Sequence, residues 1–108
     1  MDDSRHTAEP VIVRLPAEFD MSNAGYVAKQ LREAITPGVG TVVADMTTTD
    51  LCDSSGVRIV ILARDWAASD DAELRLAVPP GHVLDILKLL GLDQLLPIYP
   101  SVDEALER

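Results

Sequence analysis

The chain has few of the residues on which several common functions depend. It has one cysteine, Cys52, among 108 residues, so no disulfide can form within it. Aromatic residues make up 4% of the sequence, and nine Lys and Arg stand against 18 Asp and Glu, for a formal net charge of −9. Because nucleic acids and anionic membranes bind clustered basic residues, we expect no nucleic-acid partner and no membrane surface. A basic protein partner would suit this charge.

Long apolar runs are also missing. Charged residues interrupt every apolar stretch well before the roughly 18 residues that a membrane-spanning helix needs. Residues 1–6 lack the basic flank and the apolar core of a secretory signal. Together with the single cysteine, these absences predict a cytoplasmic protein.

The hydrophobic pattern predicts one α/β domain in which strands and helices alternate. Strands are expected at 11–15, 39–46, 73–78 and 95–99, and helices at about 24–35, 55–69, 83–90 and from 102 onwards. The second of these strands is apolar throughout, which is typical of a parallel sheet covered by helices. We therefore expect a mostly parallel (mixed) sheet of four to five strands with about four helices over residues 10–108. Residues 1–9 are expected to form a flexible start or a short edge strand.

The segment Asp53-Ser54-Ser55-Gly56 stands between the second strand and the second helix and is the best indication of function. Backbone N–H groups at a helix start have no intrahelical partners, so small oxygen-bearing residues there cap the helix, and an anion is tolerated. Strand ends gather at one edge of a parallel sheet, which places Asp20 near Asp53 and Ser54. A phosphoryl group on Ser54 would disturb a docked protein more than the domain itself. The alternative is that Ser54 and Ser55 only cap the helix.

Four segments carry a resemblance to a known family. The run from Asp45 to Val57 resembles the signature of STAS domains, in particular the bacterial anti-sigma factor antagonists. Ala17-Glu18-Phe19-Asp20 is similar to their Gly-Glu-Leu-Asp segment, with Ala17 where glycine is common, and residues 89–93 and 101–106 are similar to their C-terminal elements. The resemblance extends from about residue 11 to residue 108 and implies a STAS-like single domain.

This resemblance implies a binding protein rather than an enzyme, without a cofactor of its own. It implies that Ser54 is phosphorylated by a partner that is both an anti-sigma factor and an ATP-dependent serine kinase; ATP and magnesium belong to that partner. The unphosphorylated domain would bind the partner and free the sigma factor, regulating transcription in a stress response, and a serine phosphatase of the metal-dependent type would reset the cycle. By the same correspondence, Asp20 and Asp53 line the docking surface, Ser55 assists capping, and Gly56 allows close backbone approach.

Other interpretations stay open at this point. The chain could be a STAS subunit of a transporter, a lipid-trafficking complex or a sensor complex, without a phosphate cycle. An enzyme with Ser54 as nucleophile is disfavoured, because no His or Lys base and no Gly-x-Ser-x-Gly elbow is visible. Residues 47–49 are solvated turn threonines or alternative phosphoacceptors, and the leucine-rich run 83–96 could leave an exposed patch that supports a weak homodimer. Cys52 is expected to be a small buried residue.

Overall fold

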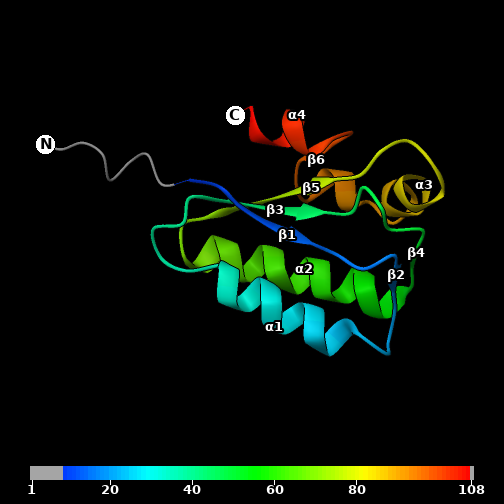
Figure 1. The fold of residues 1–108 in the computed structure, drawn as a ribbon, viewed down its shortest axis with the longest axis horizontal. Helices are drawn as coiled ribbons and strands as arrows, with labels where there is room; N and C mark the ends of the chain where they lie inside the picture. Colours follow the sequence, from blue (N-terminus) through cyan, green and yellow to red (C-terminus); the bar gives the residue numbers. More distant parts are fainter. Residues whose placement is uncertain (1–8, 108) are drawn as a thin grey trace, which may run out of the picture.

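A four-stranded parallel sheet forms the centre of the molecule in the computed structural model, which describes residues 9–107 (Figure 1). Its strands are β1 (Val11–Arg14), β3 (Thr41–Asp45), β5 (Glu73–Ala77) and β6 (Ile98–Tyr99), in this spatial order. All three pairings are parallel, so Val43 is in register with Ile12 on one side and with Arg75 on the other. The carboxyl ends of all four strands therefore point to the same edge of the sheet.

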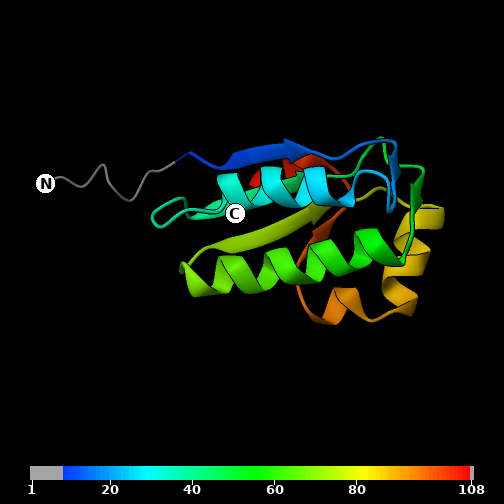
Figure 2. The same ribbon diagram turned by 90° about the horizontal axis from the view of Figure 1, so that it is seen from below.

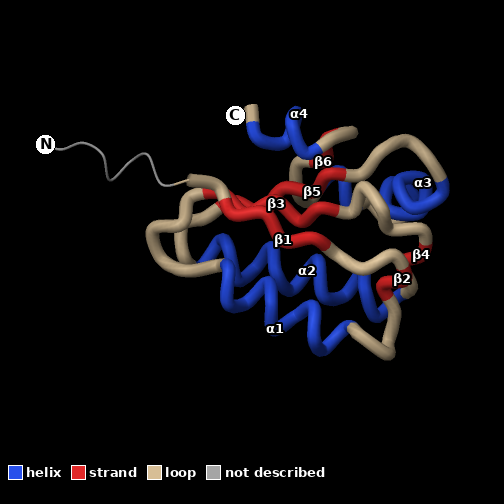
Figure 3. Tube along the Cα trace, in the orientation of Figure 1, coloured by secondary structure: helices blue, strands red, loops and turns tan. Residues whose placement is uncertain are grey.

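Three helices lie in the connections between the strands of the main sheet, as parallel pairing requires, and a fourth follows the last strand. They are α1 (Ala24–Ala34), α2 (Ser54–Ser69), α3 (His82–Leu89) and α4 (Val102–Leu106), with a short 3₁₀ helix, η2 (Leu92–Gln94), after α3. Figure 2 shows α1 and α2 side by side against one face of the sheet, and Figure 3 shows α4 on the opposite face. No helix within residues 9–107 is long and apolar enough to cross a bilayer.

The larger hydrophobic core lies between the sheet and the pair α1 and α2. Strand β3 contributes Val42 and Ala44 to this core, and Val43 from the same strand points to the opposite face, beneath α4. The whole strand except Thr41 is buried. This burial on both faces explains why the sequence of β3 is apolar without alternation.

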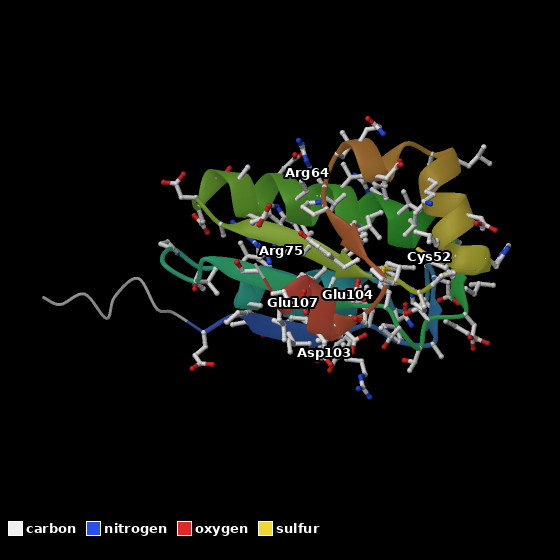
Figure 4. All side chains as sticks on the ribbon, turned by 90° about the horizontal axis from the view of Figure 1, so that it is seen from above. Cys52, Arg64, Arg75, Asp103, Glu104 and Glu107 are labelled. Carbon is white, nitrogen blue, oxygen red and sulfur yellow. The ribbon has the colours of Figure 1, made fainter. Side chains whose placement is uncertain are left out.

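Arg75 is a buried charged residue that holds α4 on its face of the sheet. Its side chain is 8% exposed; one guanidinium nitrogen donates to the carbonyl oxygen of Ala105 at 2.7 Å, and Nε pairs with Glu73 at 2.8 Å. Figure 4 shows Arg75 next to α4, which carries the exposed Asp103 and Glu104 and is followed directly by Glu107. A buried guanidinium is tolerated here because its donors are bonded.

The predicted α/β alternation is confirmed, and each predicted strand and helix is present, but the last strand, expected at 95–99, covers only Ile98–Tyr99 because Leu95 ends η2. Two further strands, β2 (Glu18–Phe19) and β4 (Leu51–Cys52), form a separate parallel pair that the sequence did not predict, nor did it predict η2. Two residues are too short to show the alternation by which a strand is recognised. The strand or flexible start expected within residues 1–9 falls almost entirely outside the described residues.

Candidate functional site

The two-stranded sheet places the segments that carry the predicted site side by side. Glu18 is in register with Leu51, and Phe19 with Cys52. The backbone N–H of Asp53 continues the pairing by donating to the carbonyl oxygen of Phe19 at 3.1 Å. Since side chains alternate along a strand, Phe19 and Cys52 point into the core, while Glu18 and Leu51 are exposed. Asp20 and Asp53 follow these paired strands directly.

Ala17 occupies the turn where the resemblance has glycine. Its carbonyl oxygen accepts from the backbone N–H groups of Asp50 at 2.7 Å and Leu51 at 3.2 Å. Asp71 is the one non-glycine residue with positive φ among residues 9–107, so the backbone of Ala17 does not require glycine. The alanine therefore leaves the turn and its bonds to the Asp50 segment in place.

Asp53 is the N-cap of α2, and its two oxygens bond in different directions. Oδ1 accepts from the backbone N–H groups of Ser55 at 2.9 Å and Gly56 at 3.1 Å, which caps the helix. Oδ2 accepts from the backbone N–H of Met21 at 3.3 Å, across 32 residues of sequence. The N-cap is therefore Asp53, and these hydrogen bonds show neither the alternative in which Ser54 and Ser55 only cap the helix nor a capping bond from Ser55.

Asp20 lies in the loop that Asp53 holds. Its Oδ1 accepts from the hydroxyl of Ser22 at 2.5 Å and from the backbone N–H of the same residue at 2.9 Å. These two bonds, the hydroxyl's first, hold the pKa of Asp20 below its usual value of 3.8, so the carboxylate is ionised at neutral pH. Asn23 braces the loop by accepting from the Asp20 N–H at 3.1 Å and donating to the carbonyl oxygen of Glu18 at 2.7 Å.

Ser54 is the first residue of α2, and its side chain is exposed. Among residues 9–107 its hydroxyl has no hydrogen-bond partner, whereas Ser55 next to it is half-buried. The structure thus gathers Asp20, Asp53 and Ser54 at one end of the molecule, with Ser54 the more accessible of the two serines. A reagent that approaches from outside can reach its oxygen.

Gly56 packs inward, beneath the first turn of α2. A Cβ at this position would lie 2.9 Å from the sulfur of Cys52 and 3.0 Å from the ring of Phe19. The groups that lie close to the backbone of Gly56 are therefore buried side chains of this chain, those of Cys52 and Phe19. Helix α2 lies directly on the two-stranded sheet because this residue has no side chain.

Cys52 is buried next to Gly56, as expected. Burial, and to a lesser extent the charge of Asp53, raises the pKa of the thiol from 9.0 to about 11. The thiol is therefore protonated at neutral pH, which suits a packing role rather than a nucleophilic one.

Two exposed apolar residues at the site were missed by the sequence analysis. Met21 is 77% exposed and Leu51 is 45% exposed, and both adjoin the carboxylates described above. The sequence feature that could have identified them is an apolar residue within a run of acidic and turn-forming residues. Such a residue is not part of a periodic pattern that packs against the core. Exposed side chains of this kind are candidates for contact with a partner.

The three threonines of the expected turn differ from one another. Thr49 is buried and its hydroxyl donates to the carbonyl oxygen of Pro16 at 2.9 Å, while the hydroxyl of Thr47 donates to Asp45 at 2.6 Å. Their interpretation as solvated turn residues holds for Thr48 alone, which is exposed. The bonded hydroxyls are also poorly placed as phosphoacceptors.

Away from this site, the leucine-rich run leaves an exposed patch, as the sequence suggested. Leu89 is 85% exposed, Leu90 55% and Leu95 40%. Trp66 packs against the core with the guanidinium of Arg32 5.2 Å from its ring centre. Within residues 9–107 no group of three or more His, Cys, Asp or Glu side chains could hold a metal ion.

Comparisons with known proteins agree with this fold. A family model described as the STAS domain matches residues 3–105. Among solved structures, TM1081 of Thermotoga maritima, described as an anti-sigma factor antagonist, superposes with a TM-score of 0.78 at 21% identity, covering 97% of each chain. A STAS protein from Planctomyces limnophilus gives 0.78 at 18% identity, covering 94% of this chain and 90% of that one. No curated protein matches significantly.

One solved relative is known in its phosphorylated form. The Bacillus cell fate determinant SpoIIAA in that form superposes with a TM-score of 0.70 at 24% identity, covering 94% of this chain and 92% of the other. The unphosphorylated form of SpoIIAA, described as an anti-sigma factor antagonist, gives 0.68 at 21% identity, covering 92% and 86%. At these identities the superpositions establish a shared fold.

Proposed function

The chain belongs to the STAS domain family, and we propose that it is a cytoplasmic anti-sigma factor antagonist controlled by phosphorylation of Ser54. In this proposal the unmodified domain binds an anti-sigma factor that is also a serine kinase, which releases the sigma factor. Phosphorylation ends this binding, and a serine phosphatase of the metal-dependent type restores it.

The observation that carries the proposal is the exposed, unbonded hydroxyl of Ser54 at the first residue of α2. A phosphate here would lie near the positive end of the helix dipole, so the domain itself should accept the charge. The hydroxyl can be modified without breaking a bond of the fold, because the cap of the helix belongs to Asp53.

The chemistry of the surface around Ser54 suits a basic protein partner. We define the docking surface as Glu18, Asp20, Met21, Leu51 and Asp53 with Ser54. It combines carboxylates with the exposed apolar side chains of Met21 and Leu51. Apolar side chains give a partner area to bury, and the carboxylates select for Lys and Arg opposite them. A phosphate adds about −1.5 to −2 charges to this surface at neutral pH.

In the proposed reaction this chain is the substrate. The Ser54 oxygen forms a bond to the γ-phosphorus of ATP held by the partner, the bond from that phosphorus to the bridging oxygen breaks, and ADP leaves. The hydroxyl proton goes to a base of the partner, since Asp53 is occupied by three backbone N–H groups and the lowered pKa of Asp20 makes it a poor proton acceptor. Hydrolysis of the same O–P bond by the phosphatase returns the hydroxyl and releases inorganic phosphate.

Intact-mass measurement after incubation with a cognate kinase-like anti-sigma factor, ATP and magnesium tests this proposal. We expect the mass of one phosphoryl group on the parent chain and on Ser55→Ala, and none on Ser54→Ala, which should stay folded and bind the partner constitutively. If the parent chain gains no phosphoryl group and forms no complex, the proposal is wrong. That outcome would favour a STAS subunit of a transporter, lipid-trafficking or sensor complex.

A further inference from the structure

Arg58 is a free cation one helical turn from Ser54. Its side chain is exposed, and within the described part of the chain it has no hydrogen bond, ion pair or ring contact. It follows Ser54 by four residues in α2, a spacing that puts two side chains on the same face of a helix with about 5–6 Å between their Cβ atoms. Long side chains in helices lean towards the N-terminus, so an arginine at position 58 can reach a group on Ser54.

The other arginines of residues 9–107 all have partners. Arg14 pairs with Asp45 at 3.6 Å, and Arg64 donates to the carbonyl oxygen of Leu95 at 2.7 Å. Arg75 is bonded beneath α4, and Arg32 lies over Trp66. Within this part of the chain Arg58 is thus the one guanidinium left unengaged, and it lies where the proposed modification would add negative charge.

The neighbouring residues favour Ser54, once phosphorylated, as the group with which Arg58 would pair. Ser55 is three residues away but half-buried, and Asp53 already accepts three backbone hydrogen bonds. A phosphate on Ser54 would stand next to the carboxylate of Asp53, which repels it. A guanidinium matches a phosphate well, because its fork of N–H donors can form charge-assisted bonds to two phosphate oxygens.

Building on the proposed function, we infer that Arg58 is the intramolecular partner of a phosphate on Ser54. The pair would change the surface in two ways at once, by adding an anion and by engaging a cation that the unmodified surface presents. A protein docked at this end would lose both the neutral hydroxyl and a free guanidinium. Arg58 therefore acts as a positioning residue for the modified state.

A double-mutant cycle on the full chain tests this inference without any kinase. Phosphoserine is installed at position 54 during translation, and the four combinations of serine or phosphoserine with Arg58 or Arg58→Gln are unfolded in urea. We expect the phosphate to raise the folded-to-unfolded ratio about two- to fivefold more with Arg58 than with glutamine. The interaction of the phosphate with the helix dipole is the same with Arg58 and with glutamine at position 58, so it cancels in the cycle.

Lys88→Gln supplies the matched control, because it removes one exposed positive charge from α3. It should leave the effect of the phosphate unchanged, and Arg58→Lys should restore part of it. As a second readout, phosphorus NMR should give a higher second pKa for the phosphoserine in Arg58→Gln than in the parent. No coupling in the cycle together with equal pKa values would overturn the inference. Because no kinase is used, this result is independent of whether a partner phosphorylates Ser54.

Discussion

At the scale of single residues, Asp53 organises the site. Its carboxylate caps α2 through Ser55 and Gly56 and holds the loop with Met21. The sequence predicted that Asp53, Ser54 and Asp20 would meet, because strand ends of a parallel sheet share an edge. It could not show which residue caps the helix, since Asp and Ser are similarly good caps. The pairing of β2 with β4 decides this by fixing where the helix begins.

Cys52 gives the chain a pH dependence on the alkaline side. Because burial raises its pKa from 9.0 to about 11, the folded chain holds the thiol proton more tightly than the unfolded chain does. The resulting stabilisation is fully present below pH 9.0 and is lost as the pH rises towards about 11. We expect urea unfolding across this range to show a steeper loss of stability for the parent than for Cys52→Ala. Parallel curves for the two chains would contradict this explanation.

At the scale of elements, the periodic segments were predictable and the short ones were not. Apolar periodicity located α1 and α2 and the strands of the main sheet, since each of them buries one or both faces in the core. Strands β2 and β4 have two residues each, so their existence depends on pairing partners more than 30 residues apart in sequence. The site residues follow these strands directly, which is why the exposure of Met21 and Leu51 became visible only in the structure.

Two glycines in helices, one at the contact between α2 and the two-stranded sheet and one away from it, are predicted to respond in opposite ways to substitution by alanine. Gly56→Ala would place a Cβ 2.9 Å from the Cys52 sulfur and 3.0 Å from the Phe19 ring, so we expect a loss of about 1–3 kcal/mol of stability. Gly25→Ala in α1 meets nothing within 4 Å and should stabilise the chain by about 0.5 kcal/mol. Both values follow from urea unfolding. Equal effects of the two substitutions would show that the contact is not tight.

At the scale of the whole molecule, the residues that stabilise the fold and the residues proposed to bind a partner lie in different places. The large core lies between the sheet and α1 and α2, while the proposed docking surface lies on the loops and short strands beyond the ends of β1 and β3. A charge added to Ser54 therefore weakens the fit between this surface and a partner, and it leaves the packing of the core unchanged. The family and the fold class could be predicted from the sequence, because they depend on motifs and periodicity. The free state of Arg58 could not, because it depends on the absence of neighbours in space.

The dissociation constant of the Ser54→Asp variant with the anti-sigma factor, measured by titration calorimetry, shows whether negative charge at position 54 ends binding. Ser54→Asn keeps a similar shape without the charge, and Thr36→Asp adds the same charge at an exposed position of the loop between α1 and β3. We expect Ser54→Asp to bind about a hundredfold more weakly than the parent, a loss of about 2.8 kcal/mol, and both controls to bind nearly as the parent does. If a folded Ser54→Asp chain binds as tightly as the parent, negative charge on Ser54 does not control the complex.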